Sequence, residues 1–94
     1  MKEYSIMKDN PPYWRNKRYP GCHRHEIFEG RTGNRDKSIK DGLVIFVSPE
    51  YHRLIHKDYK NTWLPIKEIG EKTWCEYYNK TPDDFRIKYG RNYI

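Results

Sequence analysis

Cys22-His23-Arg24-His25-Glu26 and Pro49-Glu50-Tyr51-His52-Arg53-Leu54-Ile55-His56 decide the fold, because these two stretches contain all four histidines of the chain. His52 and His56 are four residues apart in a stretch that reads as a helix, so both side chains leave the same face one turn apart. Two imidazoles at this spacing can bind one ion, and a third ligand from residues 23–25 would leave one coordination position open. That arrangement is typical of catalytic rather than structural metal sites.

The residues between these stretches predict two strands separated by a loop. Residues 22–28 read as a short strand, and residues 29–42 read as an exposed loop because Gly, Asn, Asp, Arg and Lys dominate them. Residues 43–47 are apolar without alternation, as expected for a strand that is covered on both faces.

A helix is predicted directly after the second strand. Ser48 provides a hydroxyl for the N-cap, Pro49 suits the first helical position, and Glu50 places an acid at the positive end of the helix dipole. This start places His52 and His56 together in a short helix.

Two further helices are predicted in the last third of the chain. One begins at about Thr62 and has an apolar face formed by Trp63, Ile66, Thr73 and Tyr77. Thr81 and Pro82 repeat the start signal for a last short helix, which Gly90 ends.

The composition indicates one small cytosolic domain. The chain has 94 residues, of which 35% are hydrophobic, and its mean hydropathy is −1.19. At this size one core is only marginally stabilising, so a metal ion would help to fix the fold. The sequence shows no membrane span and no apolar region of a secretory signal peptide. Cys22 and Cys75 form no CxxC pair, so a reduced protein without a disulfide framework is expected.

The chain is basic, with 19 Lys and Arg against 13 Asp and Glu and a formal charge of +6. Nine Tyr and three Trp accompany this charge, and such a composition suits a polyanion such as nucleic acid. Charge of this size also keeps small domains in solution, so composition alone does not show that the chain binds nucleic acid. Residues 1–21 hold two proline-containing turns around Tyr13-Trp14-Arg15-Asn16-Lys17-Arg18, which predicts an irregular basic and aromatic segment before a domain at residues 22–94.

Several short motifs accompany the histidines: His25-Glu26-Ile27-Phe28, Asn34-Arg35 with Ser38, Gly42-Leu43, Pro49-Glu50 through His52, Asn79-Lys80-Thr81, Asp84-Phe85 and Gly90-Arg91-Asn92-Tyr93-Ile94. With the order strand, loop, strand and helix, they resemble the HNH endonucleases, and most closely the small HNH-type proteins of phages and prophages of Gram-positive bacteria. The resemblance covers about residues 22–94, and the histidine spacing is also similar to that of the bacterial colicin DNases. It implies an α+β fold with a ββα-metal core, in which a hairpin and a helix share one ion.

The resemblance also implies roles for individual residues. His25 matches the first metal ligand, and His52 and His56 match the two helix ligands. Glu26 stands where the family often has a second histidine that acts as general base. Glu26, or else His23, is therefore expected to activate the attacking water.

The asparagine that names the family motif is expected near the start of the second strand, where this chain has Asp41-Gly42. Asn34 or Ser38 would then brace the loop instead. Guanidinium groups bind phosphate through two hydrogen bonds. The basic candidates for contact with nucleic acid are Arg24, Arg31, Arg35, Lys37 and Arg53.

Other interpretations of the same residues are weaker. The run from His25 is similar to the zincin pattern HExxH, but Glu29 stands where the second histidine must be. Residues 30–35 are too short for a P-loop and lack its Gly-Lys-Ser/Thr ending. Trp63, Trp74 and both cysteines are expected in the core. The remaining alternative for His52 and His56 is a solvated helix face.

The sequence therefore predicts a metal-dependent DNA endonuclease, encoded by a phage or prophage and located in the cytoplasm of a bacterial host. One divalent ion, Zn²⁺, Ni²⁺, Mn²⁺ or Mg²⁺, is expected at His25, His52 and His56, and three imidazoles favour the first three ions over Mg²⁺. The alternative is a catalytically inactive HNH-fold module with a structural metal, which binds nucleic acid or a phage or host protein. The residues leave open whether the chain forms a homodimer.

Overall fold

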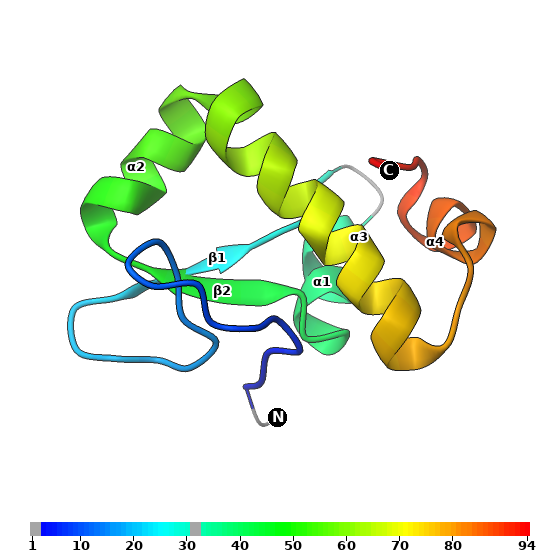
Figure 1. The fold of residues 1–94 in the computed structure, drawn as a ribbon, viewed down its shortest axis with the longest axis horizontal. Coiled ribbons are helices and arrows are strands. Elements are labelled where there is room, and N and C mark those ends of the chain that lie inside the picture. The colour runs from blue at the N-terminus through cyan, green and yellow to red at the C-terminus, as the bar shows by residue number, and fades with distance from the viewer. Residues whose placement is uncertain (1–2, 31–32) are drawn as a thin grey trace.

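The computed structural model describes residues 3–30 and 33–94 and has the α+β fold that the sequence predicted (Figure 1). Two antiparallel strands, β1 (His23–Glu26) and β2 (Val44–Val47), pair with His25 opposite Ile45. The helical elements are α1 (Asn34–Lys40), α2 (Pro49–Lys57), a π-helical turn η1 (Tyr59–Trp63), α3 (Leu64–Tyr78) and α4 (Pro82–Tyr89). In the described ranges, no helix is both long and apolar enough to cross a membrane.

Helix α1 corrects the prediction of a loop over residues 29–42. Its buried residues are the polar Asn34 and Ser38, so the segment has no apolar period that would reveal a helix. Ser38 Oγ accepts the N–H of Phe28 at 3.3 Å and donates to the carbonyl of Leu43 at 2.6 Å. Ser38 therefore braces the connection between the end of β1 and the start of β2.

Helices α2 and α4 begin where their capping residues predicted. Ser48 Oγ accepts the N–H of Tyr51 at 3.0 Å, which caps α2. Thr81 Oγ1 accepts the N–H of Asp84 at 3.2 Å, and the Asp84 carboxylate accepts the N–H of Thr81 at 3.0 Å. Only Ser48 separates β2 from α2, so the sheet fixes where α2 starts.

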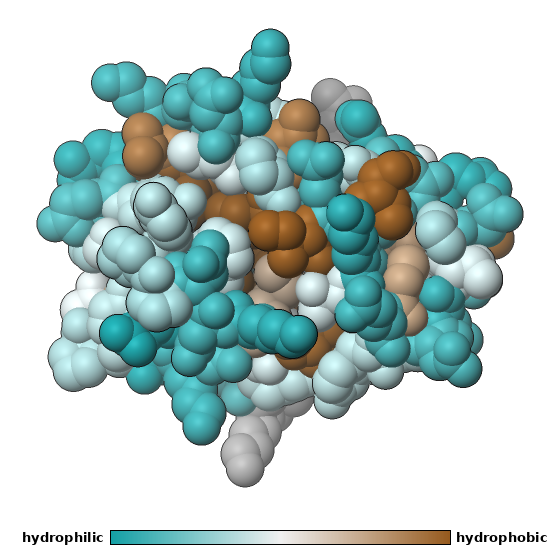
Figure 2. All heavy atoms as spheres, in the orientation of Figure 1, coloured by the Kyte–Doolittle hydropathy of each residue, from teal (hydrophilic) through white to brown (hydrophobic). Residues whose placement is uncertain are grey.

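The hydrophobic core lies between the strands and the helices, and the N-terminal segment closes it from the other side. Met7 and Trp14 of that segment are buried, and Arg15 exchanges two backbone hydrogen bonds of 2.9 Å with Phe46. Figure 2 shows hydrophobic atoms near the centre of one face with hydrophilic residues around them. The buried core residues from the regular elements and their connections include Ile27, Phe28, Leu43, Ile45, Val47, Ile55, Ile66, Trp74 and Phe85.

Helix α3 packs through a different face from the one predicted. Trp63 and Ile66 are buried as expected, whereas Tyr77 is 62% exposed. The buried stripe runs through Gly70 and Trp74 instead. A Cβ at Gly70 would lie 3.2 Å from the side chains that follow β1, so the glycine lets α3 approach them closely. One glycine and two buried charged residues interrupt the apolar pattern, and periodicity therefore indicated the wrong face.

One of these charged residues, Glu71, holds the last residues of the chain against α3. Its side chain is 0% exposed. Glu71 Oε1 accepts the backbone N–H of Tyr93 at 2.6 Å, and Oε2 accepts the side-chain amide of Asn92 at 2.8 Å. Asn92 also donates to the carbonyl of Pro82 at 2.7 Å. These donors replace the water that the buried carboxylate has lost, and they join α3 to the start of α4.

Asp41, which stands near the place expected for the family asparagine, is a second polar hub. Its carboxylate accepts hydrogen bonds from Trp74 Nε1 at 2.9 Å, from the Tyr89 hydroxyl at 2.7 Å and from Lys88 Nζ at 2.9 Å. Asp41 therefore connects the residues before β2 with α3 and α4.

Candidate metal centre

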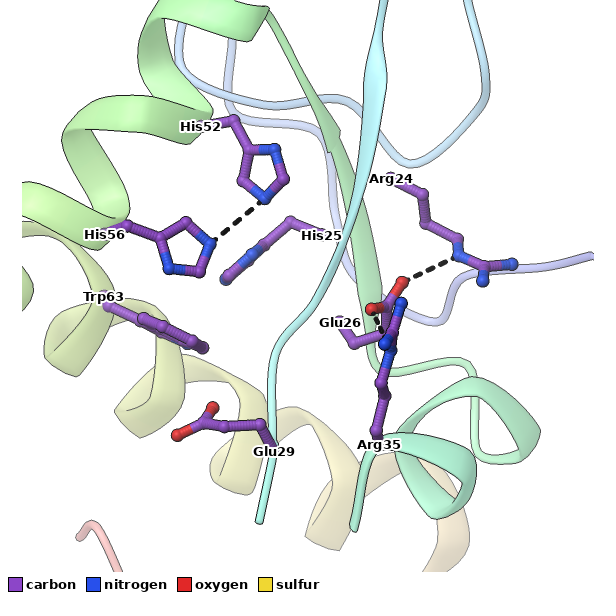
Figure 3. Close-up of a pocket in the computed structure, with 8 residues that line it drawn as sticks. All are labelled: Arg24, His25, Glu26, Glu29, Arg35, His52, His56 and Trp63. Carbon is purple, nitrogen blue, oxygen red and sulfur yellow. Dashed lines mark hydrogen bonds and ion pairs between the residues drawn. The ribbon is translucent and has the colours of Figure 1, made fainter. Parts of the chain in front are cut away.

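Three imidazoles meet where β1 lies beside α2. His25 points inward from the middle of β1, and His52 and His56 leave α2 one turn apart toward it (Figure 3). The ring centroid of His25 lies 5.4 Å from that of His52 and 5.8 Å from that of His56. The short connection from β2 to α2 sets this arrangement, since β2 is paired with β1.

The donor atoms of the three rings fit one divalent ion. One nitrogen from each of His25, His52 and His56 lies within 4.8 Å of the others, and His52 Nε2 and His56 Nε2 are 3.3 Å apart. His25 is 2% exposed, yet its Nε2 has no hydrogen-bond partner. A buried polar atom without a partner is costly. An ion held by the three rings would provide that partner, so the cluster could hold a metal ion.

The surroundings of His25 and His52 keep these two rings neutral. Burial, and after it the neighbouring His52, His56 and Lys67, lower the pKa of His25 to about 3. Burial and then His56 and His23 lower the pKa of His52. A metal ligand must be a neutral imidazole with a free lone pair. Both of these histidines are therefore in the ligating form at neutral pH.

Two further side chains hold the cluster in place. His23 Nδ1 lies 3.1 Å from His52 Nδ1, on the side of the His52 ring away from His56. The Trp63 ring packs edge-on against His25 at 4.7 Å and against His56 at 4.9 Å, and its Nε1 donates to the carbonyl of Ile27 at 2.8 Å. Trp63 was predicted as a core residue, and it is both buried and a wall of the site.

The cluster opens into a pocket of about 300 Å³. The residues that line it are Arg24, His25, Glu26, Glu29, Arg35, His52, His56 and Trp63. His23, expected as the second choice for a general base, is not one of these residues. Sequence reasoning did not assign Glu29 to the site, and considered it only as the position where the zincin pattern lacks its second histidine.

Glu26 lies on the other side of β1 from the three imidazoles (Figure 3). Its Oε2 accepts a hydrogen bond from Arg24 Nε and its Oε1 accepts one from Arg35 Nε, both at 2.8 Å. Arg24 also donates to Glu3 at 2.9 Å. Arg24 and Arg35, two of the four arginines expected to contact phosphate, are therefore engaged with the carboxylate expected to act as base.

The other basic candidates lie outside this ion-pair group. Lys37 Nζ donates to the carbonyl of Lys88 at 2.9 Å. Arg53 is exposed on α2, directly after His52, and makes no ion pair within the described part of the chain. Arg31 lies outside the described residues.

Glu29 is held by a buried lysine of α3. Lys67 Nζ donates to Glu29 Oε1 at 2.8 Å and to the Tyr59 hydroxyl at 3.1 Å. Burial opposes the charge on Lys67, but these hydrogen bonds outweigh burial and raise the pKa of Lys67. The ammonium group is therefore charged at neutral pH. It also lies 4.8 Å from the ring centroids of Tyr59 and Trp63 and 5.1 Å from that of Tyr93.

Comparisons with protein-family models, with curated proteins and with solved structures found no match to this chain. Its assignment therefore depends on the geometry of the three imidazoles and on the residues around them.

Proposed function

We propose that this protein is a metal-dependent DNA endonuclease of the HNH type, which hydrolyses phosphodiester bonds. The observation that carries the proposal is the convergence of His25 from a strand and of His52 and His56 from the following helix, with donor atoms within 4.8 Å of one another. The ββα-like order of these elements and the open pocket beside the rings support it. The encoding genome would be that of a phage or prophage, as the sequence resemblance implies.

The three histidines would hold one divalent ion, with Zn²⁺, Ni²⁺ or Mn²⁺ favoured over Mg²⁺ by imidazole ligands. When bound, such an ion supplies a Lewis acid for the scissile phosphate and its leaving oxygen. Trp63 and the core behind it keep His25 and His56 in position, and His23 orients the ring of His52. Partners of this kind fix the orientation of ligand rings.

The charge of the chain supports a nucleic-acid partner. With a formal charge of +6, the protein would attract the DNA backbone and release its counterions. Arg53 is the most available phosphate contact, because it is exposed beside His52 and has no acidic partner among the described residues. Arg24 and Arg35 would have to leave Glu26, or bind phosphate with their remaining donors.

A plasmid-nicking assay tests this function. Supercoiled DNA is incubated with the protein and Mg²⁺, Mn²⁺, Ni²⁺ or Zn²⁺, and with a chelator as a blank. Nicking is expected with at least one ion, and His56→Ala should abolish it, whereas Lys57→Ala, at the adjacent exposed position, should retain it. If no ion supports nicking, the endonuclease proposal is wrong.

One observation favours a second function. Both oxygens of Glu26 are paired with guanidinium groups, so neither is free to take a proton from water. If Glu26 were the only base available, the protein would be an inactive module that binds DNA or a protein and holds a structural ion. Metal-dependent stability and duplex binding without any nicking would be the signature of this alternative.

A further inference from the structure

Glu29 is the carboxylate that shares a side of β1 with the three imidazoles. Figure 3 shows it next to Trp63, on the same side as His25 and His56, whereas Glu26 lies across the strand. Its side chain is 45% exposed and lines the pocket. Among the described residues, the partner of Glu29 is Lys67, which binds Oε1 and leaves Oε2 free.

The lysine that holds Glu29 is unusually constrained. Its side chain is 3% exposed, and its ammonium group is enclosed by the rings of Tyr59, Trp63 and Tyr93. A buried ion pair is weak evidence for a role in stability, because the desolvation of its charges can exceed their attraction. Stability alone therefore does not explain a buried lysine whose partner stays half exposed. Orientation of the Glu29 carboxylate toward the pocket does explain it.

We propose that Glu29 is the general base of the reaction, an assignment that rests on the proposed endonuclease function. Lys67 donates to Glu29 Oε1, so Oε2 is the oxygen that can accept a proton. A water molecule in the pocket attacks the phosphorus atom and transfers one proton to Glu29 Oε2, and the phosphorus–oxygen ester bond breaks. The leaving oxygen takes a proton from solvent, and Glu29 returns its proton to solvent. One water is consumed, and the products are a phosphomonoester end and a hydroxyl end.

The two bases expected from the sequence fit the geometry less well. Glu26 has both oxygens occupied by guanidinium groups at 2.8 Å. His23 faces His52 from outside the set of residues that lines the pocket. Glu29 is the residue that combines a free acceptor oxygen, a fixed orientation and a place in the pocket.

The test compares Glu29→Gln with Glu26→Gln and with a control, Glu76→Gln, which removes the same charge from an exposed position on α3. Nicking rates are measured with the ion that gives the fastest parental reaction. Affinity for that ion is measured by calorimetry without DNA, and affinity for duplex is measured in the presence of a chelator. Glu29→Gln should lower the nicking rate by about a hundredfold or more, the usual effect of losing a general base, with both affinities within about twofold of the parent. Glu26→Gln should lower the nicking rate by a smaller factor, and Glu76→Gln should nick as fast as the parent.

A chemical rescue gives a second measurement. Added formate should restore part of the nicking rate of Glu29→Ala, because a small carboxylate can occupy the space left by the side chain and accept the proton. Restoration by formate would support the proposal, and a rate unchanged by formate would count against it.

The outcomes separate this proposal from the one on which it rests. If the parent nicks DNA and Glu29→Gln nicks equally fast, the Glu29 assignment is wrong and the endonuclease remains. If Glu29→Gln loses metal affinity in proportion to activity, Glu29 acts on the ion and not as the base. If none of the ions supports nicking by the parent protein, the endonuclease proposal fails, and the Glu29 assignment fails with it.

Discussion

At the scale of single residues, burial determines how His25 and Lys67 behave. Both side chains are almost fully enclosed, yet one is kept neutral and the other charged. Burial lowers the pKa of His25, and the titratable groups that act on it, two histidines and a lysine, lower it further. Lys67 has a carboxylate and a hydroxyl within hydrogen-bond distance, and these keep its charge. The identity of the contacting groups therefore decides the charge state of each buried side chain.

The pKa of His25 predicts a loss of stability in acid. In the unfolded chain His25 has an ordinary pKa of about 6.5 and gains a proton between pH 7 and pH 5, whereas the folded form stays neutral until the pH approaches 3. The unfolded state then binds more protons, so the free energy of unfolding should fall by about 2 kcal/mol from pH 7 to pH 5. Urea unfolding in the presence of a chelator measures this change. Glutamine at position 25 cannot titrate, so the free energy of unfolding of His25→Gln should fall correspondingly less between pH 7 and pH 5. An equal fall in the parent and the variant would contradict the explanation.

Replacing Lys67 by Met should separate stability from activity. Methionine fits among aromatic rings, and an apolar side chain avoids the desolvation cost of the ammonium group. The half-exposed Glu29 would then be solvated by water. The free energy of unfolding should change by less than about 1 kcal/mol, while nicking should fall because Glu29 is no longer oriented. A loss of about 3 kcal/mol or more in urea unfolding would show instead that the ion pair stabilises the fold.

At the scale of elements, α2 is the part of the molecule on which the site depends. It carries two of the three imidazoles, and its first turn is fixed by the Ser48 cap. Helix α4 has a comparable cap at Thr81 but carries none of the three clustered imidazoles. The two caps therefore provide a matched pair of sites for testing whether metal affinity depends on the order of the first turn of α2.

Ser48→Ala and Thr81→Ala should each lower the free energy of unfolding by about 1 kcal/mol, since each leaves a backbone N–H at a helix start without its acceptor. Only Ser48→Ala should weaken metal binding, because fraying of α2 displaces His52. Urea unfolding and titration of the ion against a competing indicator measure the two effects. Equal metal affinities in the two variants would show that the order of the first turn of α2 does not matter to the site.

The same elements show what the sequence could and could not predict. The β2 strand and the starts of α2 and α4 follow from chemistry within a few residues, and those predictions are confirmed. The helix α1 escaped detection because its buried residues are polar. Glu29 escaped detection because its partner Lys67 is 38 positions away and belongs to no motif. Local signals were therefore sufficient for the histidine cluster but not for the ion pair beside it.

At the scale of the whole molecule, the three imidazoles join the strand pair to helix α2. A metal ion that binds the folded state stabilises it by mass action. His56→Ala should therefore lower the melting temperature of the metal-loaded protein much more than that of the chelated protein. Lys57→Ala, one position further on α2, should show no such difference. Equal losses for His56→Ala in both forms would mean that the histidine acts through packing alone.

The charge of the molecule predicts salt-dependent binding to DNA. Duplex affinity should fall with salt with a log–log slope of about −0.9 for each phosphate neutralised. Arg53→Ala should make this slope shallower by about 1, because the side chain is exposed beside the site. Arg86→Ala is the control, since it lies on α4, at the opposite end of the molecule from α2 (Figure 1). Affinity that does not change with salt would favour a protein partner instead.

The buried carboxylate of Glu71 also bears on how the protein is made. Its two donors, Asn92 and the backbone of Tyr93, leave the ribosome after every helix and strand of the described structure. Until then the carboxyl group of Glu71 cannot be buried without leaving its oxygens unpaired, which is costly. The described elements should therefore stay open until residues 92–93 emerge from the ribosome. Emergence of these two residues, more than the order of the elements, would then set the moment at which the pocket forms.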